Sequence, residues 1–65
     1  MKRNEDMRRA MRRAEVFTWQ VAEKLGVSEP TVYRWLRDKE MSTEKRARFF
    51  RAIEEAQKEN ERTTN

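Results

Sequence analysis

The sequence contains no cysteine and no histidine among its 65 residues. The first absence excludes disulfides and thiolate metal sites, and the second removes the commonest transition-metal ligand and the usual general base of catalysis. No run of apolar residues approaches the roughly 18 that a membrane-spanning helix requires. We therefore expect a soluble, cytoplasmic protein that needs no metal or cofactor, takes no small-molecule substrate and is not an enzyme.

Glycine and proline are also scarce, with one residue of each. Because these two residues punctuate turns and strands, their scarcity favours helices joined by short turns over a sheet. Charged side chains make up 43% of the chain, a level that suits a disordered segment when the apolar residues are scattered. Here the apolar residues, including two Trp, three Phe and one Tyr, are grouped, and they can form the core of one small domain.

Apolar residues recur at the helical spacing of three and four in four segments. The predicted helices span about 5–14, 19–25, 29–37 and 44–58. Their predicted N-caps are Asn4, Thr18, Ser28 and either Ser42 or Thr43. The predicted inner face of the last helix comprises Ala47, Phe49, Phe50, Ile53 and Ala56. The polar residues 59–65 are expected to fray. These features predict a single all-α domain over 1–65 with four or five helices.

The positive charge is unevenly distributed. Residues 1–13 carry six basic and two acidic side chains, and residues 29–51 carry seven basic and four acidic ones, whereas residues 52–65 are net acidic. Such basic segments indicate a partner of dense negative charge, and nucleic acid is the default. The arginines of the first predicted helix, Arg8, Arg9, Arg12 and Arg13, form either a DNA contact or a solvated face, and both interpretations stay open.

The most informative stretch is TWQVAEKLGVSEPTVYRWLR, residues 18–37. Two helices that cross closely through a short turn need a small residue at the crossing, here Ala22, and a residue that opens the turn, here Gly26. Apolar residues must join the pair and hold it against the other helices, as Val21, Leu25, Val27, Val32 and Trp35 can. Meeting all these requirements together predicts a helix-turn-helix.

The second helix of this motif would lie in the DNA major groove, with its outward residues toward the base edges. The predicted base contacts are Glu29, Pro30, Thr31, Tyr33 and Arg34. Arg34 is the best candidate, because a planar guanidinium can bond bidentately to guanine. Side chains at helix N-termini or flanking the groove are predicted to contact phosphates: Thr18, Gln20, Ser28, Arg37, Lys39, Lys45 and Arg46.

Over residues 18–37 the chain resembles the Cro/C1-type (lambda-repressor-like) helix-turn-helix family, in particular short phage and mobile-element proteins with a WQVAEKLG-type second helix. The resemblance implies a compact DNA-binding regulator, such as a repressor, in which 29–37 is the recognition helix. Two residues depart from the family pattern. Thr18 stands where many members have glutamine, and Pro30 replaces a position that is often polar.

Two other functions are compatible with the sequence. Excisionase-like proteins, which bend DNA for recombination, share a G-V-S-x-x-T-V-Y-R-W-type run, found here from Gly26 to Trp35. They usually add a strand-built wing, whereas 42–58 is predicted helical. A protein-interaction module such as an antirepressor would instead hold another protein with 29–37. We also expect a homodimer, because one domain buries little DNA. The expected dimer face is the C-terminal half of the last helix, because its apolar residues exceed what one small core needs.

Overall fold

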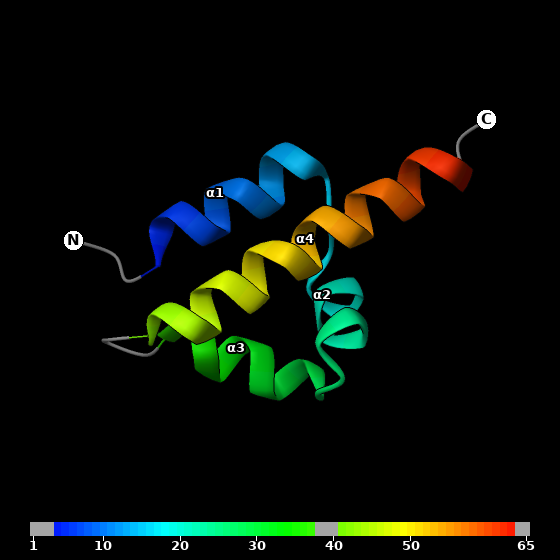
Figure 1. Ribbon diagram of the computed structural model, residues 1–65. Coiled ribbons are helices and arrows are strands. Elements are labelled where there is room, and N and C mark those ends of the chain that lie inside the picture. Colours follow the sequence, from blue (N-terminus) through cyan, green and yellow to red (C-terminus); the bar gives the residue numbers. More distant parts are fainter. Residues whose placement is uncertain (1–3, 38–40, 64–65) are drawn as a thin grey trace.

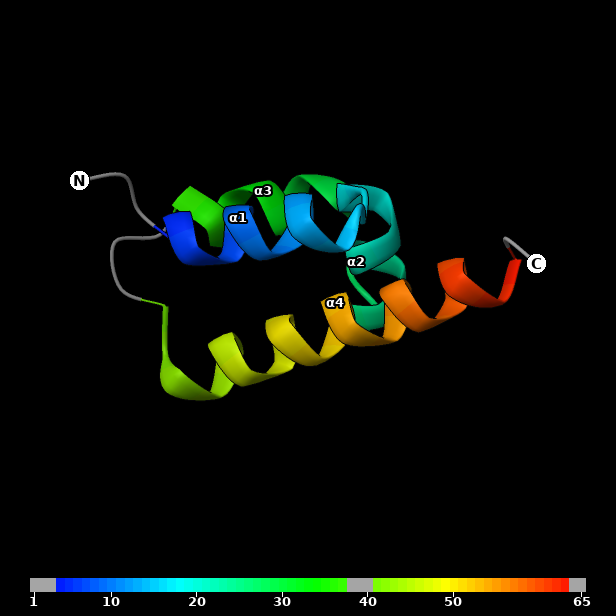
Figure 2. The same cartoon turned by 90° about the horizontal axis from the view of Figure 1, so that it is seen from above.

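The computed structural model describes residues 4–37 and 41–63. These residues form four α-helices and no strand: α1 (Glu5–Ala14), α2 (Thr18–Leu25), α3 (Glu29–Arg37) and α4 (Thr43–Thr63). Helices α1 and α3 lie in one layer, α4 runs across them in a second layer, and α2 lies beside α4 near one end (Figures 1 and 2). The predicted all-α fold is confirmed, and no described helix has the length and apolar character to cross a membrane.

The core lies between the two layers and draws on every helix. Its buried apolar side chains are Met7, Met11, Val16, Val21, Ala22, Val32, Leu36, Met41, Phe49, Ala52, Ile53 and Ala56. Phe49, Met7, Val21 and Val32 are the largest side chains that are fully buried. Burial of these groups, at about 25 cal/mol per Å² of apolar surface, is the main force that holds α3 in a fixed orientation.

Gly26 forms the corner between α2 and α3. Its φ of 75° lies in the left-handed region, which closes the end of α2. The N–H of Val27 then donates to the carbonyl of Ala22 at 3.0 Å, and the N–H of Gly26 donates to the carbonyl of Glu23 at 3.3 Å. These bonds are those of a Schellman cap, and they turn the chain sharply into Ser28 and α3.

Glu15 forms a second corner of the same kind, between α1 and α2. Its φ is 55°, and the N–H of Val16 donates to the carbonyl of Met11 at 3.0 Å. The N–H of Glu15 donates to the carbonyl of Arg12 at 3.1 Å. A glutamate held in this conformation is strained, because its Cβ lies close to the following carbonyl oxygen.

Asn4 is the N-cap residue of α1, as predicted, but its side chain makes no capping hydrogen bond. Its backbone carbonyl accepts the N–H groups of Met7 and Arg8, but its side-chain amide donates to the carbonyls of Leu36 at 3.0 Å and Trp35 at 3.3 Å. The carboxylate of Asp6 accepts the N–H of Met7 instead, at 3.0 Å. Asn4 therefore ties the start of α1 to the end of α3.

The predicted cap at Thr18 is wrong, because α2 begins at Thr18 and its N-cap is Phe17. The side-chain hydrogen bond at this end of α2 comes from Gln20, whose Oε1 accepts the N–H of Phe17 at 2.9 Å. The predicted cap at Ser42 is present, because its hydroxyl accepts the N–H of Lys45 at 3.1 Å.

The last helix extends further than predicted. Residues 59–63, which were expected to fray, continue α4. The reason is a set of polar contacts to α2: the Nε2 of Gln20 donates to the Oδ1 of Asn60 at 2.7 Å, and Glu59 pairs with Lys24. Residues 64 and 65 of the predicted fraying tail lie outside the described residues.

The inner face of α4 differs from the predicted one at three positions. Ala47 and Phe50 are exposed, and Ala52 takes a place in the core. Ile53 and Ala56, the apolar residues of the C-terminal half, are buried within a single chain. The apolar surplus on which the expected dimer face was based is therefore absent from that half of the helix as described.

Candidate nucleic-acid interface

The outward side of α3 is the surface that the motif would present to DNA. Val32 and Leu36 are buried in the core, as helical spacing predicts. The residues on the opposite side are exposed, and they are Glu29, Pro30, Tyr33, Arg34 and Arg37. Tyr33 keeps 47% of its surface accessible. The structure thus brings four of the five predicted base-contacting residues to one exposed helix face.

Thr31, the fifth of these residues, is half-buried at the edge of that face. Its hydroxyl lies 2.8 Å from the hydroxyl of Ser28, a predicted phosphate contact in the turn before α3. The carbonyl of Ser28 also accepts the N–H groups of Thr31 and Val32, which starts the helix. Ser28 itself is exposed, so a phosphate can reach its hydroxyl at the start of α3.

Two basic residues of α4 have contacts within the protein. The ammonium of Lys45 lies 5.0 Å from the centre of the Trp35 ring, on the side of α3 that faces α4. Arg46 forms an ion pair with Asp6, and its guanidinium lies 5.8 Å from the centre of the Phe50 ring. Arg46 therefore joins α4 to α1 through this ion pair.

Gln20 does not fit the predicted role in phosphate binding. It is 8% exposed, and its amide is used by Phe17 and Asn60. The reason is the register of α2, which turns Gln20 toward α4 together with Val21. Thr18 is half-buried and lines a surface groove with Tyr33, and Arg37 lies at the end of α3. Lys39 lies outside the described residues.

Two surface clefts are lined by residues of both α1 and α3. Arg8, Pro30, Tyr33 and Arg37 line one cleft of about 420 Å³. A second, of about 250 Å³, lies between Arg12, Phe17, Thr18 and Tyr33, and it shares Arg8 with the first. The arginines of α1 carried no signal in the sequence that tied any of them to α3, because the relative placement of two helices depends on packing between distant residues.

Two exposed aromatic rings lie at the start of α2. Phe17, which lines the second cleft, is 66% exposed, and Trp19 is 54% exposed. Val21 and Ala22, on the other side of α2, supply its core contacts. Large exposed rings near basic side chains mark a surface suited to packing against sugars or a partner.

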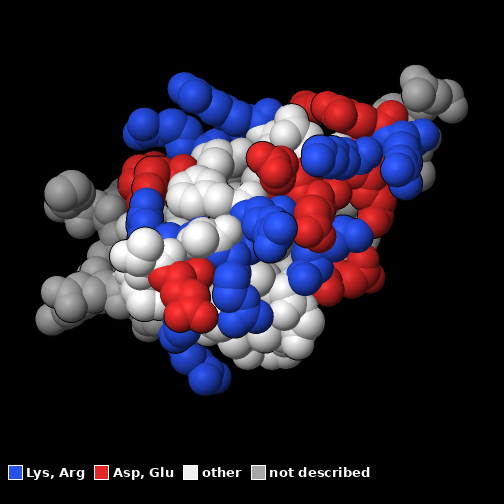
Figure 3. Space-filling view, in the orientation of Figure 1, with Lys and Arg blue, Asp and Glu red and all other residues white. Residues whose placement is uncertain are grey.

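The charged groups with shifted pKa values lie away from α3. The hydrogen bond from Arg46 lowers the pKa of the Asp6 carboxyl, and the hydrogen bond to Glu59 raises the pKa of the Lys24 ammonium. Seen from the α4 side, acidic and basic side chains are interleaved over the C-terminal half of α4 (Figure 3). Among the described residues, no cluster of acidic side chains could hold a metal ion.

Two helices joined at a glycine corner, with the second turning a basic face to solvent, define a helix-turn-helix DNA-binding domain. A family model described as a helix-turn-helix domain matches residues 18–55, more than half of the chain. The chain belongs to this family. The match begins at the first residue of α2, ends within α4 and does not single out the Cro/C1 type. No curated protein and no solved structure matches the chain.

Proposed function

We propose that this protein is a sequence-specific regulator of transcription, of phage or mobile-element type, that inserts α3 into the major groove of double-stranded DNA. The observation that carries the proposal is the division of α3 into two sides. Val32 and Leu36 are buried, whereas Tyr33 and Arg34 are exposed. A recognition helix requires this division, because its outward side chains must reach base edges while the helix stays fixed to the domain.

Each outward residue has a definite chemical capacity. Arg34 offers a planar donor pair that matches O6 and N7 of guanine. Glu29 can accept a hydrogen bond from the amino group of cytosine, and Thr31 can place a methyl against thymine. Pro30 has no polar group, so it contributes only apolar contact. The resulting readout is short, and a homodimer that reads two half-sites would supply the missing specificity.

Phosphate contacts hold the helix in register without reading sequence. We assign these contacts to Thr18, Ser28 and Arg37, together with Lys45, which lies over the ring of Trp35 of α3. We assign the protein no catalytic step. We expect it in the cytoplasm, associated with the nucleoid through DNA.

Selection of bound sequences from a random duplex pool tests this function. We expect an enriched motif that contains guanine. Arg34→Ala should weaken binding to that motif by about 1–3 kcal/mol, which is about 5- to 150-fold in Kd. Arg51→Ala, on the exposed side of α4, is the matched control and should change the sequence preference little. No enrichment, or equal effects of the two substitutions, would contradict the proposal.

An excisionase-like architectural protein is the second candidate. The run from Gly26 to Trp35 favours it, and so does the association of the matched family with excisionase-like proteins. The region where a strand-built wing would follow is α4, which is helical throughout as described. Energy transfer between dyes at the two ends of a bound duplex separates the candidates, because an architectural protein must bend DNA and a simple regulator need not.

A protein-interaction module, such as an antirepressor, is the third candidate, and it makes the opposite prediction. Such a protein would not retard random duplex DNA in a gel even at low salt and high micromolar concentration. Sedimentation at micromolar concentration tests the homodimer separately, because a monomer in solution would leave dimerisation to the DNA.

A further inference from the structure

We infer that one side of α1, the row formed by Arg8 and Arg12, binds DNA phosphates next to α3, whereas the row formed by Arg9 and Arg13 does not. The inference rests on the proposed function and adds a second binding element to it. Helix α1 lies outside the 18–55 segment that matches the helix-turn-helix family. A role in DNA binding for α1 therefore has to be derived from the geometry of this chain.

Arg8 is held against the recognition helix. Its guanidinium donates to the carbonyl of Leu36 at 3.5 Å, near the end of α3. It lines the cleft of about 420 Å³ whose other walls are Pro30, Tyr33 and Arg37. A DNA strand that runs past the exposed side of α3 would bring a phosphate to two guanidinium groups in this cleft, Arg8 of α1 and Arg37 of α3.

Arg12 extends this surface by one helical turn toward α2. It lines the adjoining groove with Phe17, Thr18 and Tyr33. Arg8 and Tyr33 belong to both clefts, so the two form one continuous path from the end of α3 to the start of α2. The first N–H groups of α2 lie at the far end of this path and add a partial positive charge.

The ion pair of Arg12 does not oppose this role. Arg12 lies 3.4 Å from Glu5, and its side chain is 66% exposed. An exposed pair of this kind contributes little to stability, and salt screens it. A phosphate diester can therefore replace Glu5 as the partner of Arg12 at little cost.

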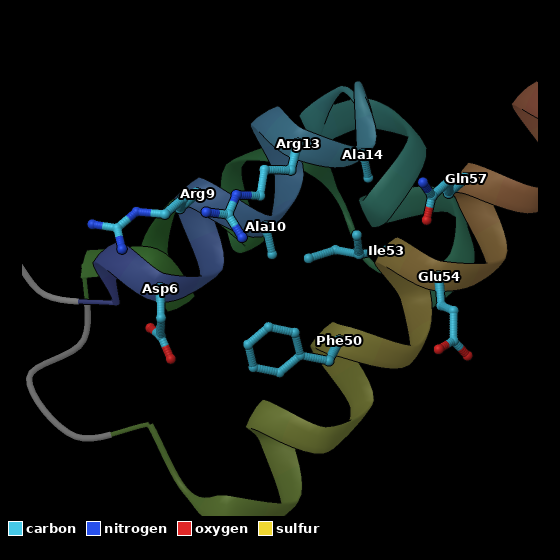
Figure 4. Close-up of a pocket in the computed structure, with 9 residues that line it drawn as sticks. All are labelled: Asp6, Arg9, Ala10, Arg13, Ala14, Phe50, Ile53, Glu54 and Gln57. Atoms are coloured by element: carbon cyan, nitrogen blue, oxygen red, sulfur yellow. The ribbon is translucent and has the colours of Figure 1, made fainter.

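Arg9 and Arg13 lie on another side of α1. They line the groove of about 520 Å³ between α1 and α4, together with Phe50 and Ile53 (Figure 4). Helix α4 is in the second layer of the fold, across from the layer that α1 and α3 share (Figure 2). The Arg8–Arg12 row therefore borders the outward side of α3, against which a duplex would lie, whereas the Arg9–Arg13 row borders α4.

The chain offers a matched pair of variants to test this. R8A/R12A and R9A/R13A have the same composition, net charge and helix, and they differ only in the row that is removed. Fluorescence anisotropy gives the Kd for a labelled duplex between about 50 and 200 mM salt. The slope of log K against log salt should fall by about 1.8 in R8A/R12A, or about 0.9 for each lost phosphate contact. It should stay at the wild-type value in R9A/R13A.

Three further variants keep the test valid if R8A/R12A fails to fold, because Arg8 also bonds to Leu36. R8K/R12K should keep the wild-type slope, since lysine still neutralises phosphate. The single variants R12A and R13A leave Arg8 intact and should differ in slope by about 0.9. Circular dichroism shows whether each variant is folded.

Failure of this inference and failure of the proposed function give different results. Wild-type binding with equal slopes in the two double variants would overturn the inference and leave the proposed function standing. No binding of the duplex by the wild-type protein would overturn both.

Discussion

Helices α3 and α4 both expose basic side chains, but they use them differently. On α4, Arg46 pairs with Asp6 of α1, Lys45 lies over the ring of Trp35, and Glu59 pairs with Lys24. On α3, the exposed Tyr33 and Arg37 line an open surface cleft. Two basic side chains of α4 thus contact neighbouring helices, whereas Arg37 of α3 borders an open cleft.

The strongest effect should come from the core side of α4. Phe49→Ala should lower the free energy of unfolding by about 3–5 kcal/mol, because it removes a fully buried ring and leaves a cavity. Phe50→Ala is the neighbouring control and should change stability much less, since Phe50 is 37% exposed. Chemical denaturation measures both values. Similar losses in the two variants would show that the inner face of α4 is misassigned.

The next largest effect on stability should come from the contact between Gln20 and Asn60. Gln20→Ala should destabilise the fold by about 1–3 kcal/mol, because it removes two part-buried hydrogen bonds, one with the N–H of Phe17 and one with Asn60. Asn60→Ala should cost less, since the bond between Gln20 and Phe17 remains. The double variant should cost less than the sum of the two, as expected for residues in contact. Strict additivity, measured by urea denaturation, would mean that this bond does not hold the end of α4.

Substitutions at the two corners, Gly26 and Glu15, should change stability in opposite directions. Gly26→Ala should destabilise by about 1 kcal/mol, and this cost comes from the left-handed backbone, because an added Cβ meets no atom within 4 Å. Glu15→Gly should stabilise by about 0.5–1 kcal/mol, since it relieves the same strain at the other corner. Thermal melting compares them, and a loss of stability in Glu15→Gly would contradict the assigned strain.

The smallest effect should be a dependence on acid. The bond from Arg46 lowers the folded-state pKa of Asp6 below 3.8, so its stabilisation is complete above that value and is lost as the pH falls through the folded-state pKa. The pair is largely exposed, so salt should weaken it. Asp6→Asn should remove this part of the acid dependence. If Tm depends on pH in the same way in Asp6→Asn and in the wild-type protein, the acid dependence comes from other groups.

The helices and the helix-turn-helix followed from local signals in the sequence. Apolar spacing marked the inner sides of α1 to α3, and Gly26 marked the corner, because these depend on residues within a few positions of one another. The exposed side of α3 followed from the same periodicity. The polar residues that fix one helix to another could not be found this way. Asn4 and Gln20 have partners more than 30 positions distant, and residues 59–63 looked like a polar tail.

The division of the α1 arginines shows the same limit. Spacing places Arg8 with Arg12 and Arg9 with Arg13, but only the packing of α1 decides which row borders α3. Arg46 was predicted to contact phosphate because it is basic and near the motif. Its position opposite Asp6 depends on how α4 crosses α1, which no local pattern reports.

Nuclear magnetic resonance of the arginine side chains can establish directly whether α3 carries the DNA-binding surface. The Nε–Hε signals of Arg34 and Arg37 should shift when the selected duplex is added, whereas those of Arg51 and Arg62 on α4 should stay in place. Shifts confined to the α4 arginines, with Arg34 and Arg37 unchanged, would contradict the assignment of α3 as the recognition helix.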